Sequence, residues 1–233
     1  MRPDLVYPLK DSEVNEEFRY SLRSVEKHAK NYGKVITIGG VVKGIKPDIT
    51  IPLRQTGGTK YDKVNMTFRE ICLNPEISEN FILMNDDFFI MEDTDMSKLK
   101  TYYRCSMADY LQIIIDACCP SSYTERLAKA AMALEMLKLD TKCYEEHMPM
   151  LFNKHKLLEV IGAFYGFCGT RSLYGNYHKI KAIKSPDCKV FTKGDNFIKD
   201  TPYLSTTDAS FRLGRVGEYI RDQFKEKSRY EHD

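Results

Sequence analysis

The first part of the chain alternates between short apolar runs and helical periodicity. Residues 4–9, DLVYPL, are an apolar run that predicts a strand. In residues 15–33 four apolar side chains recur at steps of four, three and four and so share one side of a helix: Phe18, Leu22, Val25 and Ala29. Asn15 is a suitable N-cap for this helix, and Gly33 is a suitable stop.

The following segments continue this alternation. Residues 34–40 are a β-branched run that ends in two glycines, and residues 48–53 are a second strand candidate. Residues 62–75 predict a helix that ends at Asn-Pro, and residues 80–91 supply the next strand. This order of elements predicts an α/β domain with a mostly parallel sheet flanked by helices. In such a sheet the C-terminal ends of the strands, and hence a ligand site, lie along one edge.

From about residue 106 the pattern is mainly helical. Three long segments show helical period and good helix formers: residues 106–119, 121–140 and 149–167. Residues 179–208 mix short strands and turns, and residues 217–231 predict a closing amphipathic helix. The chain shows no repeat or flexible linker. We therefore expect two parts, residues 1–105 and 106–233, packed as a single compact unit.

Composition narrows the class of protein without naming its function. The 233 residues are 42% hydrophobic and 29% charged, which is enough to build a sizeable core. A net charge of +2 is far from the strongly basic balance typical of nucleic-acid binders. The first ten residues have no apolar region behind a basic one, so we expect no secretory leader, and no later stretch approaches the roughly 18 apolar residues of a membrane span. Seven scattered cysteines indicate reduced thiols, so we expect a cytoplasmic protein.

Two adjacent carboxylates interrupt an apolar segment. In SENFILMNDDFFIMED, residues 78–93, Asn85, Asp86 and Asp87 directly follow the run FILM. An ionised carboxylate that is removed from water needs a compensating positive charge. At the carboxyl edge of a sheet, such oxygens suit Mg²⁺ or Mn²⁺ that bridges to a phosphate. The alternative is a polar turn between two strands, with both acids in water.

Three motifs give these residues a context: NEEFRYSLRSVEKH at 15–28, NPEISENFILMNDDFFI at 74–90 and HMP at 147–149. They resemble motifs of the Stealth family of capsular-polysaccharide phosphotransferases, which includes the catalytic region of lysosomal-enzyme N-acetylglucosamine-1-phosphotransferase. The first two matches are long and specific, and the third is short. The resemblance implies a nucleotide-sugar-binding fold of the GT-A glycosyltransferase kind, a divalent cation, and transfer from a UDP-sugar or similar donor.

The chain also departs from the family. The aspartate-rich opening segment of the family is VYPLKDS here, at residues 6–12, and the insertion usual before the arginine-bearing helix is missing. We therefore expect a donor-binding part in residues 1–105 and an acceptor-side part in residues 106–233, with transfer of a sugar or a sugar phosphate to a glycan. The compact chain also resembles small phage-encoded glycosyltransferases, so hydroxymethylated bases of phage DNA are an alternative acceptor. A non-catalytic binding module with this fold is a third possibility. The expected location is the cytoplasm of a bacterium or of a phage-infected host.

The family match implies several donor-binding residues. Arg19 and Arg23 lie four residues apart on the first helix, share one face, and could reach a diphosphate. Their alternative role is that of solvated helix charges. Lys63 and Asn65 are expected to begin the next helix, whose N-terminus favours anions. Simple helix capping is the alternative there.

His147 precedes Pro149, a residue suited to the first turn of a helix. We therefore expect its imidazole at a helix entrance, where it could act as a general base or hold a phosphate. The predicted catalytic residues are His147 and Asp87. Asp86 and Asp87 are expected to hold the metal, and Asn85 to contact the donor. A cation held in this way stabilises charge on the leaving phosphate.

Three remaining features have simple interpretations. One conceivable zinc set matches no familiar ligand spacing, and its cysteines are better interpreted as core thiols: Cys118, Cys119, Cys143 and His147. Residues 172–184 interleave aromatic and basic side chains, which would suit a nucleic acid, although an exposed basic strand is the simpler interpretation. Asp208 is either a further site carboxylate or, as we expect, the N-cap of a helix.

Overall fold

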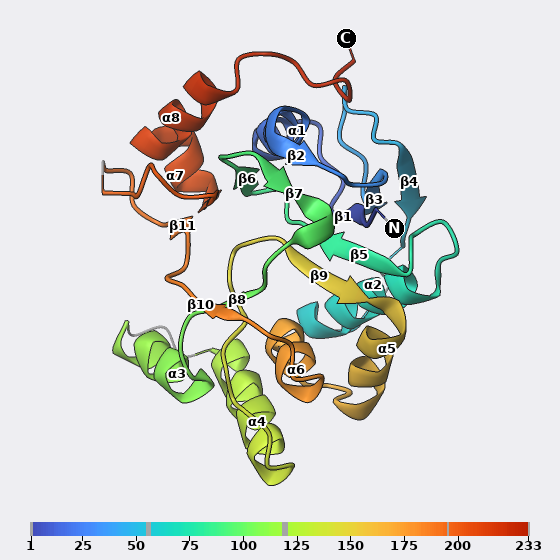
Figure 1. Ribbon diagram of the computed structural model, residues 1–233, viewed down its shortest axis with the longest axis vertical. Coiled ribbons are helices and arrows are strands. Elements are labelled where there is room, and N and C mark those ends of the chain that lie inside the picture. The colour runs from blue at the N-terminus through green and yellow to red at the C-terminus, as the bar shows by residue number, and fades with distance from the viewer. Residues whose placement is uncertain (1, 55–56, 118–120, 195, 233) are drawn as a thin grey trace.

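The computed structural model describes residues 2–54, 57–117, 121–194 and 196–232. Its centre is a five-stranded sheet of order β4-β3-β1-β5-β9, drawn in Figure 1. The strands are β1 (Asp4–Leu9), β3 (Val35–Gly39), β4 (Ile49–Pro52), β5 (Asn80–Leu83) and β9 (Met150–Asn153). The first four run parallel and β9 runs antiparallel to β5. The predicted fold class, an α/β protein with a mostly parallel sheet, is confirmed.

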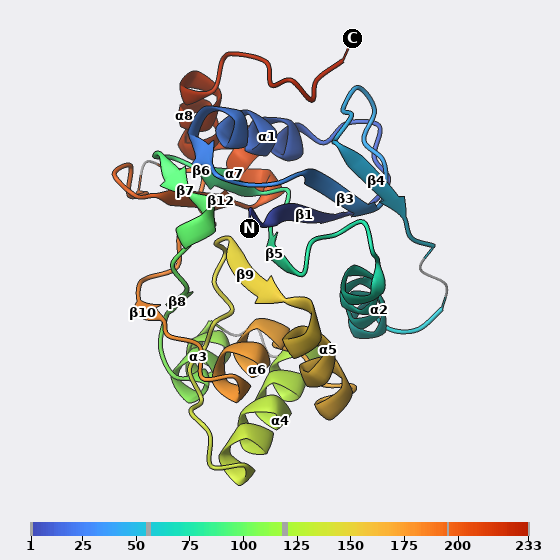
Figure 2. The same ribbon diagram turned by 45° about the vertical axis from the view of Figure 1, so that its right-hand side comes forward.

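Helices cover both faces of this sheet, as Figure 2 shows. They are α1 (Glu16–His28), α2 (Lys60–Leu73), α3 (Met107–Asp116), α4 (Ser122–Met136), α5 (Lys154–Ala163), α6 (Thr170–Tyr177), α7 (Asp208–Leu213) and α8 (Arg215–Gln223). Alternate side chains of β1 enter different cores, because successive strand residues point to opposite faces. Leu5 and Tyr7 pack with α1, whereas Val6 packs in the core that includes α2 and α5. The central strand is therefore buried on both faces.

The first helix begins as predicted and ends early. The Asn15 side chain accepts a hydrogen bond from the Phe18 backbone N–H at 2.9 Å and caps α1. The helix ends at His28, and not at Gly33, because the chain turns into the short strand β2 (Ala29–Lys30). Gly33 instead packs against β1, where an added Cβ would lie 2.3 Å from Asp4 Oδ1.

The segment 149–167 is not one helix, contrary to the prediction. Its first residues form β9, which hydrogen-bonds along β5, and α5 starts only at Lys154. Met150 and Phe152 are buried on one face of the strand, which is the two-residue period of a sheet. Asn153 then accepts from the Lys156 backbone N–H at 3.2 Å and caps α5. Pairing with an open sheet edge has overridden the local helical preference.

The segment 80–91 also differs from its prediction of a single strand. It forms β5 and then β6 (Phe88–Ile90), which belong to different sheets and are separated by residues 84–87. A second sheet has the order β11-β12-β6, with β11 at Lys189–Val190 and β12 at Tyr203–Thr206. Strands from the later part of the chain thus complete sheets that the earlier part begins.

Two further predictions need correction. Residues 172–184 are an exposed basic strand only at their end, because residues 172–177 belong to the largely buried helix α6 and only the exposed pair Ile183–Lys184 forms a strand, β10. The closing helix ends at Gln223, well before the predicted residue 231. No helix in the described part of the chain has both the length and the apolar character needed to cross a bilayer.

Candidate functional site

Asp86 lies in the turn between β5 and β6, at the carboxyl edge of the parallel strands. Its Oδ2 accepts a hydrogen bond from Asn15 Nδ2 at 2.7 Å, so the cap residue of α1 also holds this carboxylate. Burial raises the pKa of Asp86, the neighbouring Asp87 charge adds to this, and the Asn15 hydrogen bond opposes it. Asp86 is thus a partly buried acid whose charge is only weakly compensated.

Asp87 is held by residues from the distant second sheet. Its Oδ2 accepts from Lys189 Nζ at 2.7 Å and from Ser205 Oγ at 3.2 Å. Its Oδ1 is buried and has no hydrogen-bond partner among the described residues. A buried polar atom without a partner is costly, so this oxygen is one that a water molecule or an ion would satisfy. Both acids lie in a turn between two strands, as the alternative interpretation had it, but each is partly buried and hydrogen-bonded to a distant side chain.

A cavity of about 540 Å³ opens beside Asp86. We call it the Asp86 cavity, and its lining includes Asn15, Glu17, Asp86, Asp208 and Arg212. The start of α1, the β5–β6 turn and the start of α7 each contribute to it. Three of these side chains are carboxylic acids, so the cavity is suited to a cation or to a ligand that arrives with one.

Glu17 was missed by the sequence reasoning, although it is part of the NEEF motif. Its Oε1 accepts a hydrogen bond from Thr206 Oγ1 at 2.6 Å. Burial raises the pKa of Glu17 to about 7; the Thr206 hydrogen bond opposes this, and the charges of Asp87, Asp86 and Asp208 add to it. The sequence did contain a signal for this residue: Glu17 lies in the first turn of the predicted helix, and that helix faces the carboxylates.

Asp208 does not cap its helix, contrary to our expectation. Thr207 is the N-cap of α7, and its hydroxyl accepts from the Ser210 backbone N–H at 3.1 Å. Asp208 is instead the first residue of the helix, and its side chain lies 3.7 Å from Arg212 NH1 and lines the Asp86 cavity.

His147 lies in the loop before β9. No helix begins at Pro149, so the predicted helix entrance is wrong. His147 Nδ1 lies 2.7 Å from Asp187 Oδ2, and its backbone N–H donates to Asp187 Oδ1 at 3.0 Å. Because Met150 is paired with Leu83 in antiparallel register, the chain before β9 leaves the sheet at the same edge as the chain after β5. His147 and the Asp86 turn thus share this edge.

Two sets of contacts connect His147 with Asp87. The first is the segment 187–189, in which Asp187 contacts His147 and Lys189 contacts Asp87. The second is Arg171 on α6, whose NH1 donates to the Met148 carbonyl at 2.7 Å and whose guanidinium lies 5.5 Å from the centre of the Phe88 ring. Met148 and Phe88 are the chain neighbours of His147 and Asp87. The structure therefore brings the two predicted catalytic residues into one region.

The predicted donor-binding arginines have a structural partner. Arg19 NH1 lies 2.9 Å from Glu231 Oε2, and Arg23 Nε lies 2.7 Å from Glu231 Oε1. Lys63 and Asn65 do not begin a helix, because Thr59 caps α2 and the helix starts at Lys60. Of the described residues that line the Asp86 cavity, none is among these four. Asn85 lies in the β5–β6 turn, where its carbonyl accepts from the Phe88 backbone N–H at 3.2 Å.

The acidic side chains fit a cation that arrives with a ligand better than a resident one. In the described part of the chain, no three His, Cys, Asp or Glu side chains are placed to hold a metal. Mg²⁺ is commonly bound by one or two carboxylates together with substrate phosphates and water. Asp86 and the free Oδ1 of Asp87 meet that requirement. Of the zinc set, Cys143 is fully buried, and Cys118 and Cys119 lie outside the described residues.

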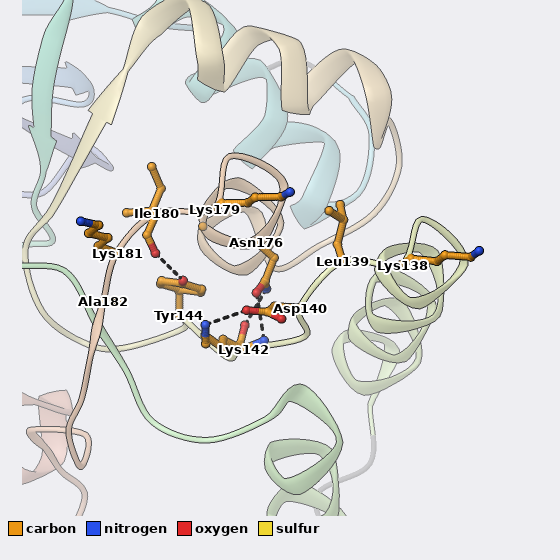
Figure 3. A pocket seen from close by; sticks show the side chains of 11 residues that line it. Lys138, Leu139, Asp140, Lys142, Tyr144, Asn176, Lys179, Ile180, Lys181 and Ala182 are labelled. Carbon is orange, nitrogen blue, oxygen red and sulfur yellow. Dashed lines mark hydrogen bonds and ion pairs between the residues drawn. The ribbon is translucent and has the colours of Figure 1, made fainter.

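A second cavity, of about 690 Å³, is lined by lysines but has a structural explanation (Figure 3). Lys138 and Lys179 follow the last turns of α4 and α6, where cations are stabilised by the helix dipole. Lys142 pairs with Asp140 at 2.7 Å. Because these charges already offset helix ends or an acid, the cavity gives no separate indication of a ligand.

Comparison with known proteins gives little further guidance. No family model and no curated protein matches the chain. Solved structures similar to it include the apo form of the glycosyltransferase GlyE of Streptococcus pneumoniae TIGR4, at 10% identity and a TM-score of 0.43, covering 97% of this chain and 61% of that one. A second GlyE structure has 10% identity and a TM-score of 0.35, with 96% and 50% covered. The chain thus spans about half to three fifths of these structures, and similarity at this level supports no argument about function.

Proposed function

We propose that this protein is a metal-dependent transferase that moves a sugar, or a sugar phosphate, from a nucleotide-sugar donor to a glycan. The observation that carries the proposal is the buried, unpartnered Oδ1 of Asp87 next to Asp86, at the carboxyl edge of a parallel sheet. Ligands of open α/β sheets bind at this edge. The sequence resemblance to the Stealth family falls on the same residues and favours a UDP-sugar as the donor.

In this proposal the donor diphosphate lies at the Asp86 cavity. Asp86 and Asp87 would hold a Mg²⁺ or Mn²⁺ ion, which would supply positive charge against the negative charge of the leaving phosphate. Lys189 fixes the Asp87 carboxylate through its 2.7 Å contact and leaves Oδ1 available. Asn85, in the same turn, is placed to contact the donor. Arg19 and Arg23 would contribute only after exchange of Glu231 for a donor phosphate.

His147 is the proposed general base. When a sugar is transferred, Nε2 takes the proton of an acceptor hydroxyl while that oxygen forms a bond to the anomeric carbon. The bond between the anomeric carbon and the phosphate oxygen breaks, and the nucleoside diphosphate leaves with the electron pair. The neutral imidazole becomes an imidazolium, whose proton returns to solvent after release of the products.

A glycan is the acceptor that the resemblance and the low net charge favour over DNA. The aromatic residues Tyr174 and Tyr177 of the segment at 172–184 belong to α6, where they are not interleaved with its exposed lysines, and the chain carries a net charge of only +2. Contacts with DNA phosphates would make acceptor affinity fall steeply with salt concentration. We expect the Michaelis constant for the acceptor to be nearly independent of salt between low and physiological ionic strength. A steep dependence would favour a DNA acceptor instead.

The test of the proposed function combines binding and turnover. We expect isothermal titration to detect UDP binding that requires Mn²⁺, and Asp87→Asn to abolish metal-dependent hydrolysis of the donor. Asp222→Asn is the matched control, because Asp222 lies near the end of α8 and forms an exposed ion pair with Lys225. Near-normal donor hydrolysis in Asp87→Asn would overturn the proposal. Binding of UDP without any turnover by the wild-type protein would indicate a non-catalytic module.

A further inference from the structure

The carboxylate of Asp187 engages His147 at two atoms. Oδ2 lies 2.7 Å from the ring nitrogen Nδ1, and Oδ1 accepts the His147 backbone N–H at 3.0 Å. Fixing the ring nitrogen and the backbone of one residue with one carboxylate leaves the imidazole little rotational freedom. An ionised carboxylate can only accept hydrogen bonds, so Nδ1 must carry the proton. The neutral ring then presents Nε2 as an unprotonated acceptor.

A second residue keeps Asp187 ionised and in place. The Arg104 guanidinium forms an ion pair with Asp187 and also contacts Glu146 Oε1 through Nε at 3.0 Å. Burial would raise the pKa of Asp187, but the hydrogen bond and charge of His147 and the charge of Arg104 outweigh it and lower that pKa below its usual range. The Asp187 side chain is only 13% exposed, so this arrangement is shielded from competing water.

Nε2 of His147 is available to a ligand. The side chain is 28% exposed, and Nε2 makes no hydrogen bond to any residue that the structure describes. Phe191, with 65% of its surface exposed, lies beside the imidazole with the two ring centres 6.4 Å apart and the rings nearly perpendicular. The ring is thus anchored on its Nδ1 side by a buried carboxylate and open on the other side.

The chain contains a second His–Asp pair that shows what an ordinary surface pair looks like. His28 Nδ1 lies 2.9 Å from Asp93 Oδ1, and the Asp93 side chain is 72% exposed. Among the described residues, Asp93 makes no hydrogen bond to the His28 backbone and has no arginine partner. The arrangement around Asp187 goes well beyond this, because the Asp187 side chain is only 13% exposed, accepts two hydrogen bonds from His147, and is paired with Arg104.

We propose that Asp187 is a positioning residue for the transfer reaction, which holds the His147 imidazole in the Nδ1–H form so that Nε2 faces the acceptor hydroxyl as a base. This inference rests on the proposed function and adds a residue to it. Lys189, two positions further along the chain, donates a hydrogen bond to Asp87 and so fixes that carboxylate. The segment 187–189 therefore sets the geometry of the acceptor-side base and of the donor-side carboxylate together.

The deciding variant is Asp187→Asn, which preserves shape but can donate its amide N–H to Nδ1. The ring would then carry its proton on Nε2 and could no longer act as a base. Because general-base catalysis contributes about 10²- to 10⁴-fold, we expect kcat to fall by about that factor, with little change in the Michaelis constant for the donor. Asp93→Asn is the matched control, and its kcat should equal that of the wild type.

A spectroscopic measurement keeps the inference testable if Asp187→Asn folds poorly. Nitrogen-15 NMR of histidine-labelled wild-type protein should show the Nδ1–H form for His147, assigned by loss of its signals in His147→Gln. In folded Asp187→Asn the Nε2–H form should replace it. An Nε2–H ring in the wild type, or an unchanged kcat in folded Asp187→Asn, would overturn the inference. Failure of the wild type to bind any nucleotide-sugar would overturn the proposed function instead, which is a separate result.

Discussion

Lys189 Nζ lies 2.7 Å from Asp87 Oδ2, and the two side chains are only 15% and 14% exposed. The Lys189 ammonium group therefore supplies part of the positive charge that the neighbouring, partly buried carboxylates Asp86 and Asp87 require. It engages one oxygen of Asp87 and leaves the other without a partner. Lys189 therefore offsets only part of the negative charge of Asp86 and Asp87. A cation that arrives with a ligand would offset the rest.

Lys189→Met removes the partner of a buried carboxylate, and we expect it to destabilise the protein by about 3 kcal/mol. The loss should appear as a lower free energy of unfolding in urea at pH 7. Adding Asp87→Asn should recover part of it, because the uncompensated charge is then gone. Lys225→Met, at an exposed ion pair, is the control and should show no measurable loss. Strictly additive effects of the two substitutions at the site would contradict a direct Lys189–Asp87 interaction.

Glu17→Gln should stabilise the protein at alkaline pH. Burial, together with neighbouring carboxylates, raises the pKa of Glu17 from 4.5 to about 7 in the folded state. The folded protein therefore loses stability as pH rises from about 4.5 to 7, because the unfolded chain ionises first. Glutamine keeps the acceptor for Thr206 and removes the charge. We expect a gain of about 1–2 kcal/mol at pH 8, allowing for solvent screening, and none at pH 4. An equal gain in stability at pH 8 and at pH 4 would contradict the raised pKa of Glu17.

Local patterns predicted the elements that depend on neighbouring residues. The period of Phe18, Leu22 and Val25 placed the start and the buried face of α1 correctly, although not its end, because these side chains form the stripe that packs on β1. The apolar runs at β1, β3 and β4 were equally clear. The carboxylates after β5 were recognised because charge within an apolar segment is costly. In each case the residues that determine the feature lie close together in the sequence.

The remaining features depend on partners that are distant in sequence. Lys189 is 102 residues from Asp87, and Glu231 is 208 residues from Arg23, so no local pattern reveals either pair. Helical preference at residues 149–167 concealed β9, which forms because β5 offers an open edge. Asp187 carried no signal in the sequence, since its role comes only from the approach of His147 and Arg104.

Glu231→Gln should reveal the structural role of the two arginines on α1. Burial would raise the pKa of Glu231, but hydrogen bonds from Arg23, the Ser228 backbone and Arg19 outweigh it and lower that pKa from 4.5 to about 2. The stability that the folded protein gains from the ionised Glu231 is fully present above pH 4.5 and is lost as pH falls toward 2. We expect Glu231→Gln to lower the free energy of unfolding by about 2 kcal/mol at pH 7, with the difference from wild type shrinking in acid.

Glu13→Gln is the control for this experiment, because Glu13 and its partner Lys43 are 86% and 79% exposed. Its free energy of unfolding should match that of the wild type at every pH. If Glu231→Gln were equally silent at pH 7, the arginines would not depend on Glu231. They would then be free to bind a donor phosphate without a structural cost.

Two helical glycines should respond in opposite ways to alanine. In α8, a Cβ at Gly217 would lie 1.7 Å from the Phe211 carbonyl oxygen, so Gly217→Ala must push apart α7 and α8. In α5, a Cβ at Gly162 would meet no atom within 4 Å. We expect Gly217→Ala to cost about 3 kcal/mol and Gly162→Ala to gain up to about 1 kcal/mol in thermal or urea unfolding. Because α7 carries Asp208 into the Asp86 cavity, Gly217→Ala should also weaken UDP and Mn²⁺ binding, whereas Gly162→Ala should leave it unchanged. If Gly217→Ala left the free energy of unfolding unchanged, α7 and α8 would be less tightly packed than the structure indicates.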